Sequence, residues 1–397
     1  MQIKVHPGKL TGSIQAISSK SQAHRMLICA ALSDKPCRIY CPETNEDIDA
    51  TASCLNALGA YIHREGAHFN VTPISDIPNE ATLDCRESGS TLRFLLPLVG
   101  ALGVSTTFIM QGRLHKRPLS PLWEEMERMG CRLCRPTETT AFCTGNLVPG
   151  DYNIDGGVSS QFITGLLFAL AVLPGKSTLR ITGTLQSKPY VDITRDVLSA
   201  FGVRTDEEIK GRFPFTGPGS LSVEGDWSNA AFFLAANALG NNIEVTNLNS
   251  KSFQGDREIA NLIPAFEQKQ VIDVSQIPDL VPILSILAAA KSGAEFINIQ
   301  RLRLKESDRV ASVQEMLSNM GIHTEATNEK LTIHPGRFIG CTVNSYNDHR
   351  IAMAAAIAST IAEGPIQITN PLCVNKSYPA FWQDFAKLGG SYESLEG

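Results

Sequence analysis

A short pattern recurs along this chain of 397 residues and limits what it can fold into. In each copy, apolar residues at helical spacing run into a glycine, and residues of alternating character follow. The glycine suits the left-handed residue that ends a helix, and the alternation predicts a strand leaving that helix. Five copies lie at residues 58–62, 129–133, 201–205, 320–324 and 388–390, and a sixth, without its glycine, lies near residues 266–274.

One further helix is predicted between successive copies of this pattern. These helices should begin near Lys20, Ser88, Ser159, Ser228, Asp279 and Asn347. The chain therefore divides into six similar units, each with two helices and several strands. Because no unit of this size could bury its sheet alone, the units must pack together. The sequence predicts an α/β protein.

Two joins between halves are predicted. The segment Gly217-Pro-Gly-Ser, followed by Val223-Glu-Gly-Asp, is the clearest boundary signal in the middle of the chain. A second join near residues 12–19 would let the first strand belong with the C-terminal half. We therefore expect one domain of three units at residues 13–223 and another at residues 1–12 plus 224–397.

The composition excludes several classes of protein. With 43% hydrophobic residues, 19% charged residues and a net charge of −5, the chain is not disordered and lacks the cationic surplus of a nucleic-acid coat. No apolar run is long enough to suggest a membrane span, and the first residues lack a signal-peptide pattern. The ten cysteines are scattered, which favours reduced thiols. We expect a cytoplasmic protein that does not associate with membranes.

Motifs for cofactors and metals are not found. There is no P-loop and no G-x-G-x-x-G after a predicted strand, which disfavours nucleotide hydrolysis and dinucleotide chemistry. The single C-x-x-C of Cys131 and Cys134 has no second pair, so an ordinary strand is the better interpretation. The histidines are dispersed along the sequence. We expect no metal and no cofactor.

Several predicted helix starts are rich in cations and hydroxyls. Lys20 and Arg25 lie in the segment 19–25, which contains no acid and leads into an apolar helix. A helix N-terminus carries a partial positive charge, so cations there make physical sense when an anion is bound. Similar segments occur at 87–93 and 157–161, although a serine there can simply cap a helix.

Basic clusters follow at later helix starts. They lie at residues 113–118, 187–190, 305–309 and 347–350, and Lys376 precedes Pro379 at the expected start of another helix. Taken singly, such clusters are often solvated faces. Their accumulation in an acidic chain predicts a pocket for a polyanionic small molecule. Asp279, Glu306 and His349 would then be candidate proton carriers.

Taken together and in order, these segments resemble the enolpyruvyl transferases, and within them the EPSP synthases. The resemblance runs from Ser19 to about Pro379. It implies a two-domain inverse α/β barrel of six βαβαββ units, with helix N-termini facing an interdomain cleft. It also implies transfer of the enolpyruvyl group of phosphoenolpyruvate to the 5-hydroxyl of shikimate 3-phosphate, with release of phosphate. This fold needs no second chain, so a monomer is expected.

The resemblance assigns roles to individual residues. The catalytic set is Lys20, Asp279, Glu306 and His349; Asp279 takes the proton of the 5-hydroxyl and Glu306 protonates the methylene carbon. The residues around shikimate 3-phosphate are Lys20, Ser21, Arg25, Ser159, Ser160, Ser187, Tyr190, Asp279 and Lys305. The residues around phosphoenolpyruvate are Lys20, Gly89, Arg113, Gln161, Arg309, Arg350 and Lys376.

The chain departs from the family pattern in the segment before Gly89. Where many members have Gly-Asn, this chain has Arg86-Glu87, and a carboxylate there would repel phosphoenolpyruvate unless Arg86 or Arg93 neutralises it. The loop before Arg113 is short, which affects the register of that residue. Gly89 leaves room beside the phosphoenolpyruvate site, so sensitivity to glyphosate, which occupies that site in the family, is expected.

Two other functions were weighed. The sister enzyme that uses UDP-N-acetylglucosamine typically carries a reactive cysteine before an Arg-Pro, and residues 112–118 contain no cysteine. A non-catalytic binder of an anionic metabolite would need the cations but not the proton carriers. Turnover with each acceptor separates these alternatives.

Overall fold

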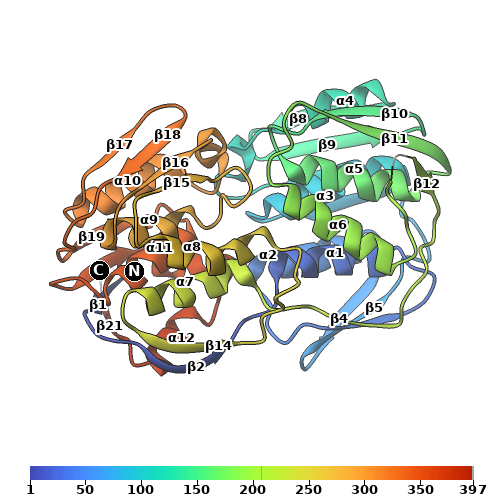
Figure 1. Ribbon diagram of the computed structural model, residues 1–397. Coiled ribbons are helices and arrows are strands. Elements are labelled where there is room, and N and C mark those ends of the chain that lie inside the picture. The colour runs from blue at the N-terminus through green and yellow to red at the C-terminus, as the bar shows by residue number, and fades with distance from the viewer. Residues whose placement is uncertain (207, 396–397) are drawn as a thin grey trace. The chain divides into compact units, whose positions relative to one another are not determined.

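The computed structural model describes residues 1–206 and 208–395, and its chain divides into two compact domains (Figure 1). The N-domain comprises residues 18–224, and the C-domain comprises residues 1–17 and 225–397. The first join falls after Ile17 rather than after residue 12, where the sequence placed it. The reason is strand β2 (Thr11–Gln15), which pairs in parallel with β14 (Asn242–Thr246) of the C-domain.

Six sheets account for the strands of the described residues, three in each domain. In the N-domain, one sheet has the strand order β6 (Glu80–Asp84), β7 (Ser105–Ile109), β9 (Thr140–Gly145) and β8 (Cys131–Thr137). A second sheet has the order β10 (Asp151–Asp155), β11 (Gly175–Thr182) and β12 (Ile209–Gly211). The third has the order β13 (Ser220–Ser222), β3 (Cys37–Tyr40), β5 (His68–Thr72) and β4 (Tyr61–Glu65). In the C-domain, β2 and β14 form one sheet. The others are β15 (Gln270–Asp273), β16 (Ala294–Ile297), β18 (Lys330–Ile333) and β17 (Thr324–Ala326), and β19 (Cys341–Asn344), β20 (Ile366–Thr369), β1 (Gln2–His6) and β21 (Ser391–Leu395).

The sheets share one pairing scheme. Each contains one parallel pair, such as β6 with β7, and the strands added beyond it pair antiparallel. A parallel pair needs a crossover, whereas antiparallel strands can follow a tight turn. In four sheets one helix supplies the crossover, but the parallel pairs β2–β14 and β3–β13 join strands that lie far apart in the sequence. The repeated helix-to-strand pattern of the sequence therefore corresponds to repeated sheets.

The outer helices end at the junctions that the sequence predicts. They are α2 (Glu46–Ala57), α4 (Leu122–Arg128), α6 (Lys188–Ala200), α8 (Ile259–Ala265), α10 (Arg309–Asn319) and α12 (Phe381–Lys387). The glycine after five of them has a positive φ, from 76° at Gly202 to 112° at Gly130. A side chain rarely adopts this conformation, so the predicted left-handed role of these glycines is confirmed.

The inner helices form the core. They are α1 (Lys20–Ala31), α3 (Gly89–Leu102) and α5 (Ser160–Val172) in the N-domain, and α7 (Trp227–Ala238), α9 (Val281–Ala290) and α11 (His349–Ala358) in the C-domain. They are buried on nearly every face, as expected for helices that are apolar all round. Each begins within about two residues of its predicted start. Their polar first turns therefore carry most of the candidate residues.

Short helices complete the chain and correct two predictions. They are η1 (Leu114–Lys116), η2 (Gly255–Glu258), η3 (Gln300–Leu304) and η4 (Pro371–Lys376). Lys305 does not open a helix: it follows η3, and α10 begins at Arg309 because Asp308 caps it. Lys376 likewise ends η4 rather than starting a helix at Pro379, and α12 begins at Phe381.

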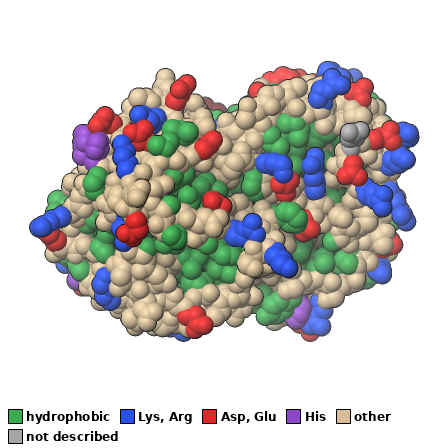
Figure 2. Space-filling view, in the orientation of Figure 1, with side chains coloured by type: hydrophobic (Ala, Val, Ile, Leu, Met, Phe, Trp, Pro, Cys, Tyr) green, Lys and Arg blue, Asp and Glu red, His purple; other side chains and the backbone are tan. Residues whose placement is uncertain are grey.

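Positive and negative side chains are interspersed on the face shown in Figure 2. None of the helices in the described part of the chain combines the length and the apolar character that crossing a membrane requires.

Candidate active site

In the N-domain, Arg25 is a buried cation without an acidic partner among its hydrogen bonds. Its guanidinium also lies over the ring of Phe94, 4.9 Å from the centroid. Burial lowers the pKa of Arg25 to about 9. It donates to neutral oxygens: Thr194 Oγ1 at 2.8 Å, Thr164 Oγ1 at 3.3 Å, and the carbonyls of Tyr190 at 2.9 Å and Ser21 at 2.5 Å. These contacts tie the starts of α1, α5 and α6 together, and the hydrogen bonds that Arg25 makes to the described residues compensate its charge with dipoles.

Lys20 is the first residue of α1 and is held differently. Its Nζ lies 2.9 Å from the carboxylate of Asp47 on α2, and both side chains are largely buried. An unpaired ammonium at a helix N-terminus would be unfavourable, so Asp47 compensates for the local positive charge. The sequence analysis did not single out Asp47, because the residue is 27 positions away from Lys20.

A chain of hydroxyls connects α1 to the start of α3. His24 Nδ1 lies 2.7 Å from Thr51 Oγ1, which lies 2.7 Å from Thr91 Oγ1, and Thr91 donates to Ser88 Oγ at 2.7 Å. Burial, with Lys20 and Arg25 nearby, holds the pKa of His24 well below its usual value. The imidazole is therefore neutral and fixes the relative positions of these helix starts.

The start of α5 is linked to that of α3 through Gln161. Its side chain donates to Ser90 Oγ at 3.0 Å and accepts from Arg93 at 2.7 Å. Ser159 caps α5 by accepting from the Gln161 backbone N–H at 3.3 Å, whereas the buried Ser160 is the first helical residue. The capping role of Ser159 leaves Ser160 and Gln161 as polar groups beyond what a cap requires.

The segment around Gly89 is tight. A methyl group at Gly89 would lie 2.5 Å from a guanidinium nitrogen of Arg117, and one at Gly112 would lie 2.4 Å from the carboxyl group of Glu87. Glu87 therefore lies beside the loop that leads into Arg113. Arg93, which the sequence offered as a neutralising partner, donates to the Pro118 carbonyl at 2.7 Å as well as to Gln161.

Three other predicted residues of the N-domain differ in setting. Arg113 is exposed and precedes η1, and no described hydrogen bond of its side chain joins it to the helix starts. Ser187 is buried and precedes α6 with a φ of 54°, a strained conformation for a residue with a side chain. Tyr190 contributes its carbonyl to Arg25.

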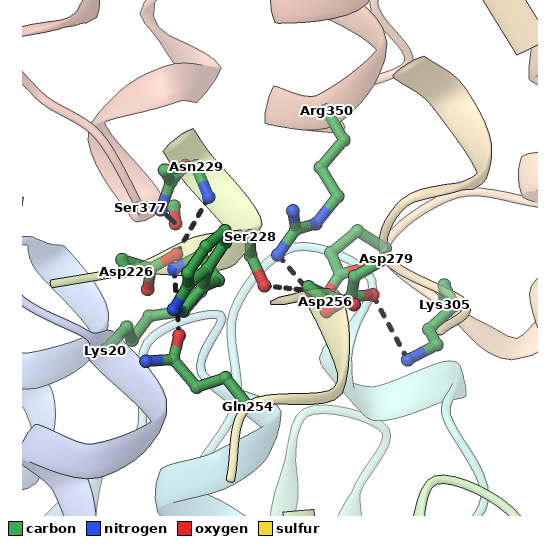
Figure 3. Close-up of polar contacts among 12 residues, drawn as sticks. Lys20, Asp226, Ser228, Asn229, Gln254, Asp256, Asp279, Lys305, Arg350 and Ser377 are labelled. Atoms are coloured by element: carbon green, nitrogen blue, oxygen red, sulfur yellow. Dashed lines mark hydrogen bonds and ion pairs between the residues drawn. The ribbon is translucent and has the colours of Figure 1, made fainter. Parts of the chain in front are cut away.

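In the C-domain, the carboxylate of Asp279 is surrounded by cations (Figure 3). It accepts from Arg309 at 2.6 Å, from Arg350 at 3.1 Å and from Lys305 at 3.4 Å. Burial alone would raise the pKa of Asp279, but the three cations hold it well below its usual value. Burial lowers the pKa of Lys305 to about 8. Asp279 is therefore ionised at neutral pH.

Arg309 joins three carboxylates in this cluster. Besides Asp279, it contacts Glu306 at 2.6 Å and Asp348 at 2.9 Å. Asp348 is fully buried and also caps α11 by accepting from the Arg350 backbone N–H at 3.0 Å. The sequence analysis named the segment 347–350 but assigned no role to Asp348, since a cap and an ion-pair partner leave the same local signal.

Asp256 is a third carboxyl, after Asp47 and Asp348, that was not predicted from the sequence. It is buried, accepts from Ser228 Oγ, and lies near Asp279 and Arg350 (Figure 3). Burial, strengthened by the charge of Asp279, raises the pKa of Asp256 to about 7. Two adjacent carboxyl groups thus have widely separated proton affinities, an arrangement typical of acid–base sites.

The remaining predicted residues lie at the ends of neighbouring elements. His349 is buried at the start of α11, beside Arg350. Lys376 is buried at the end of η4 and donates to the Asn347 carbonyl at 2.9 Å. Ser377 accepts from Asn229 of α7 at 3.2 Å, so η4 is fixed to an inner helix.

The sequence is similar to known proteins along nearly its whole length. Residues 5–385 match the family model described as EPSP synthase (3-phosphoshikimate 1-carboxyvinyltransferase). The 3-phosphoshikimate 1-carboxyvinyltransferase of Clostridium kluyveri is 39% identical over 419 residues, and that of Clostridium perfringens strain 13 is 38% identical over 418 residues. Each alignment covers 98% of this chain and 98% of the relative.

Solved structures share the fold. EPSP synthase from Acinetobacter baumannii superposes with a TM-score of 0.79 at 21% identity, over 99% of this chain and 100% of that chain. The enolpyruvyl transferase NikO from Streptomyces tendae superposes with a TM-score of 0.75 at 19% identity, over 100% and 99% of the two chains. The predicted two-domain inverse α/β fold is thus confirmed. From the family match and its full-length relatives, this chain belongs to the EPSP synthase family.

Proposed function

We propose that the protein transfers the enolpyruvyl group of phosphoenolpyruvate to the 5-hydroxyl of shikimate 3-phosphate, in chorismate and aromatic amino-acid biosynthesis. Family membership supports this reaction. The observation that carries it is the Asp279 cluster, where one carboxylate is held by Lys305, Arg309 and Arg350 with Glu306 on the same arginine. A site that only bound anions would have no need of these carboxylates.

The proposed reaction is an addition followed by an elimination. Asp279 takes the proton of the 5-hydroxyl group, and the hydroxyl oxygen bonds to C2 of phosphoenolpyruvate. Glu306 delivers a proton to the methylene carbon, which becomes a methyl group, and a tetrahedral intermediate forms. Loss of phosphate, which takes the proton held by Asp279, and return of one methyl proton to the Glu306 carboxylate restore the double bond and both side chains. The cations stabilise the negative charge of the intermediate and of the departing phosphate.

The cations around Asp279 impose an order on this reaction. A carboxylate with a strongly lowered pKa is a weak base, and an acid in contact with a guanidinium is poorly placed to hold a proton. Both substrates carry a carboxylate and a phosphate, which compete for Arg309, Arg350 and Lys305. Substrate binding would therefore free Asp279 and Glu306 for proton transfer, so binding precedes activation.

The residues of the N-domain serve mainly to bind. Arg25, Ser159, Ser160, Ser187 and Tyr190 are assigned to shikimate 3-phosphate together with Ser21 and Lys20. Gly89, Gln161 and Arg113 are assigned to phosphoenolpyruvate with Arg309, Arg350 and Lys376. His349 completes the catalytic set with Lys20, Asp279 and Glu306. In this proposal each domain contributes residues that are assigned to shikimate 3-phosphate and residues that are assigned to phosphoenolpyruvate.

Phosphate release tests the proposal directly. The protein is incubated with phosphoenolpyruvate and either shikimate 3-phosphate or UDP-N-acetylglucosamine, with a chelator present. We expect release only with shikimate 3-phosphate. Release with the nucleotide sugar alone would assign the sister reaction. Calorimetric binding of shikimate 3-phosphate without turnover would indicate a non-catalytic binder and would direct attention to Glu87.

Three further expectations accompany the reaction. Glyphosate should inhibit in competition with phosphoenolpyruvate. We also propose that the protein acts as a monomer, because each domain contains its own buried core. A cytoplasmic location is proposed because the ten cysteines are free thiols, which a reducing compartment preserves. Light scattering on the purified protein checks the oligomeric state.

A further inference from the structure

Three potential metal ligands meet on the hairpin of β17 and β18. They are His323, Glu325 and His334, and their donor atoms all lie within 4.8 Å of one another. Although the histidines are dispersed in the sequence, the fold brings two of them together here. His323 and His334 are separated in sequence, but the antiparallel pairing of the two strands brings them opposite each other.

The register of the hairpin explains the meeting. Thr324 pairs with Ile333 and Glu325 pairs with Thr332, so His323 stands opposite His334. The backbone N–H of His334 donates to the His323 carbonyl at 3.1 Å, which extends the ladder by one position. Residues two apart on a strand point to the same face, and Glu325 therefore joins both imidazoles.

The donor atoms already lie close to the spacing of ligands in a metal centre, although the shorter contact is a hydrogen bond that would have to lengthen by a few tenths of an ångström. Nε2 of His334 lies 3.0 Å and Nε2 of His323 lies 3.4 Å from the same oxygen, Oε1 of Glu325. Two donors bonded to one tetrahedral zinc ion at about 2.0–2.2 Å are about 3.3–3.5 Å apart. The ring centroids of His323 and His334 lie 4.9 Å apart, with 33° between the ring planes. A small rotation of the rings would bring one nitrogen of each imidazole to the same spacing.

We propose that His323, Glu325 and His334 bind a divalent transition-metal ion such as Zn²⁺. Two imidazoles and one carboxylate favour this class over Mg²⁺ or Ca²⁺, which take oxygen ligands. The three side chains lie at the surface, where Figure 2 shows histidines gathered over this hairpin, so water can complete the coordination. The ion would link the residues flanking β17 and β18. Strand β18 also pairs with β16, so the linked hairpin is part of the larger sheet. None of the three residues is assigned to enolpyruvyl transfer.

The test uses the full-length protein without an affinity tag, stripped with a chelator. Zn²⁺ is titrated by calorimetry, and Co²⁺ by its visible absorption, which reports tetrahedral coordination. We expect one ion per chain in the wild type and in the H63A/H68A control, which removes two histidines from the β4–β5 hairpin. The H323A/H334A variant should bind at least about tenfold more weakly, and Glu325→Gln should fall in between.

The readouts separate this proposal from the proposed reaction. Turnover with shikimate 3-phosphate should be the same in both double variants, with circular dichroism to show that each is folded. Failure of the wild type to bind one equivalent of Zn²⁺ or Co²⁺ would overturn the metal site. Equal binding by wild type and H323A/H334A, or equal loss in the H63A/H68A control, would do the same.

Discussion

The two domains hold their candidate cations in opposite electrostatic settings. In the N-domain, Arg25 is buried among hydroxyls, carbonyls and an aromatic ring. In the C-domain, Arg309 is equally buried but contacts the carboxylates of Asp279, Glu306 and Asp348. Charge compensated by dipoles still attracts an incoming anion, whereas charge compensated by carboxylates changes their proton affinities. The N-domain is therefore suited to binding and the C-domain to proton transfer.

Lys20 is the exception that refines this contrast. It belongs to the N-domain, yet it forms an ion pair with Asp47. Substrate anions would have to displace that carboxylate, as they would displace Asp279 from its cations. Like Arg309, Lys20 is paired with a carboxylate, and the proposed function accordingly assigns it to catalysis as well as to both substrates.

The largest expected effect concerns Asp279, the proposed base. Asp279→Asn should lower kcat by about a thousandfold, because an amide cannot accept the proton of the 5-hydroxyl. Binding of shikimate 3-phosphate, measured by calorimetry, should change far less. Poor binding of shikimate 3-phosphate together with normal kcat at saturation would contradict the assignment of proton transfer to the C-domain.

A matched control for this substitution is Asp273→Asn. Asp273 is an exposed carboxylate at the end of β15, where it accepts from the Ser275 backbone N–H at 2.8 Å. Its substitution should leave kcat unchanged, so a general loss of activity on removing any acid from the C-domain can be recognised.

The complementary change in the N-domain should act on binding. Arg25→Lys keeps the charge but cannot serve all four of the oxygens that the guanidinium contacts. We expect KM for shikimate 3-phosphate to rise about 10- to 100-fold with a smaller change in kcat. Steady-state kinetics with saturating phosphoenolpyruvate measure both.

Arg64→Lys is the control for Arg25. Arg64 also lies over an aromatic ring, 5.0 Å from the centroid of Phe69, and donates to the Pro42 carbonyl at 2.8 Å. It lies on β4, and its guanidinium donates to the carbonyls of Pro42 and Gly66 rather than to residues of an inner helix. If both substitutions raised KM equally, loss of packing rather than loss of an anion contact would explain the result.

The pH dependence of stability tests the C-domain setting. The pKa of Asp256 is about 7 in the folded protein, against about 3.9 when unfolded. Between these values only the folded state holds the proton. The free energy of unfolding should therefore fall as pH rises from about 4 to about 7, by about 1.4 kcal/mol per pH unit, and then level off.

Asp256→Asn should remove this slope. Urea denaturation of wild type and variant between pH 4 and pH 8 gives the difference. Asp192→Asn serves as the control, since Asp192 pairs with the exposed Lys188 on α6 in the other domain. Parallel curves for wild type and Asp256→Asn would contradict the raised pKa and weaken the view that carboxyl proton affinities are tuned in the C-domain.

The sequence was most informative where local chemistry decides structure. The starts of α5 and α11 could be predicted because apolar runs follow Ser159 and Asn347, and the junction glycines because few other residues tolerate a positive φ. Partners distant in sequence could not be predicted. Thr194 is 169 positions from Arg25, and Asp348 is 39 from Arg309.

The same limit explains the metal ligands. A prediction of His323 opposite His334 requires the register of β17 and β18, and a shift by one residue would send one imidazole to the other face. The sequence specifies a strand readily, but pairing register depends on how the whole hairpin packs. Local motifs therefore predicted the helix starts well and the cross-strand cluster not at all.

The smallest expected effect concerns Gly89 at the start of α3. The steric account from the sequence placed an added methyl against glyphosate, but the structure adds a nearer obstacle: the Arg117 guanidinium, 2.5 Å away. Since that group ends a flexible side chain, it can shift. Gly89→Ala should therefore raise KM for phosphoenolpyruvate only about threefold to tenfold and weaken glyphosate by more, while Gly8→Ala, with open space around its added methyl, should change neither. A double variant, Gly89→Ala with Arg117→Ala, separates the causes. Recovery of glyphosate binding would identify the displaced arginine as the obstacle. Continued loss would identify direct crowding of the ligand by the added methyl group, and the shape of the N-domain site would then matter for binding as well as its charge.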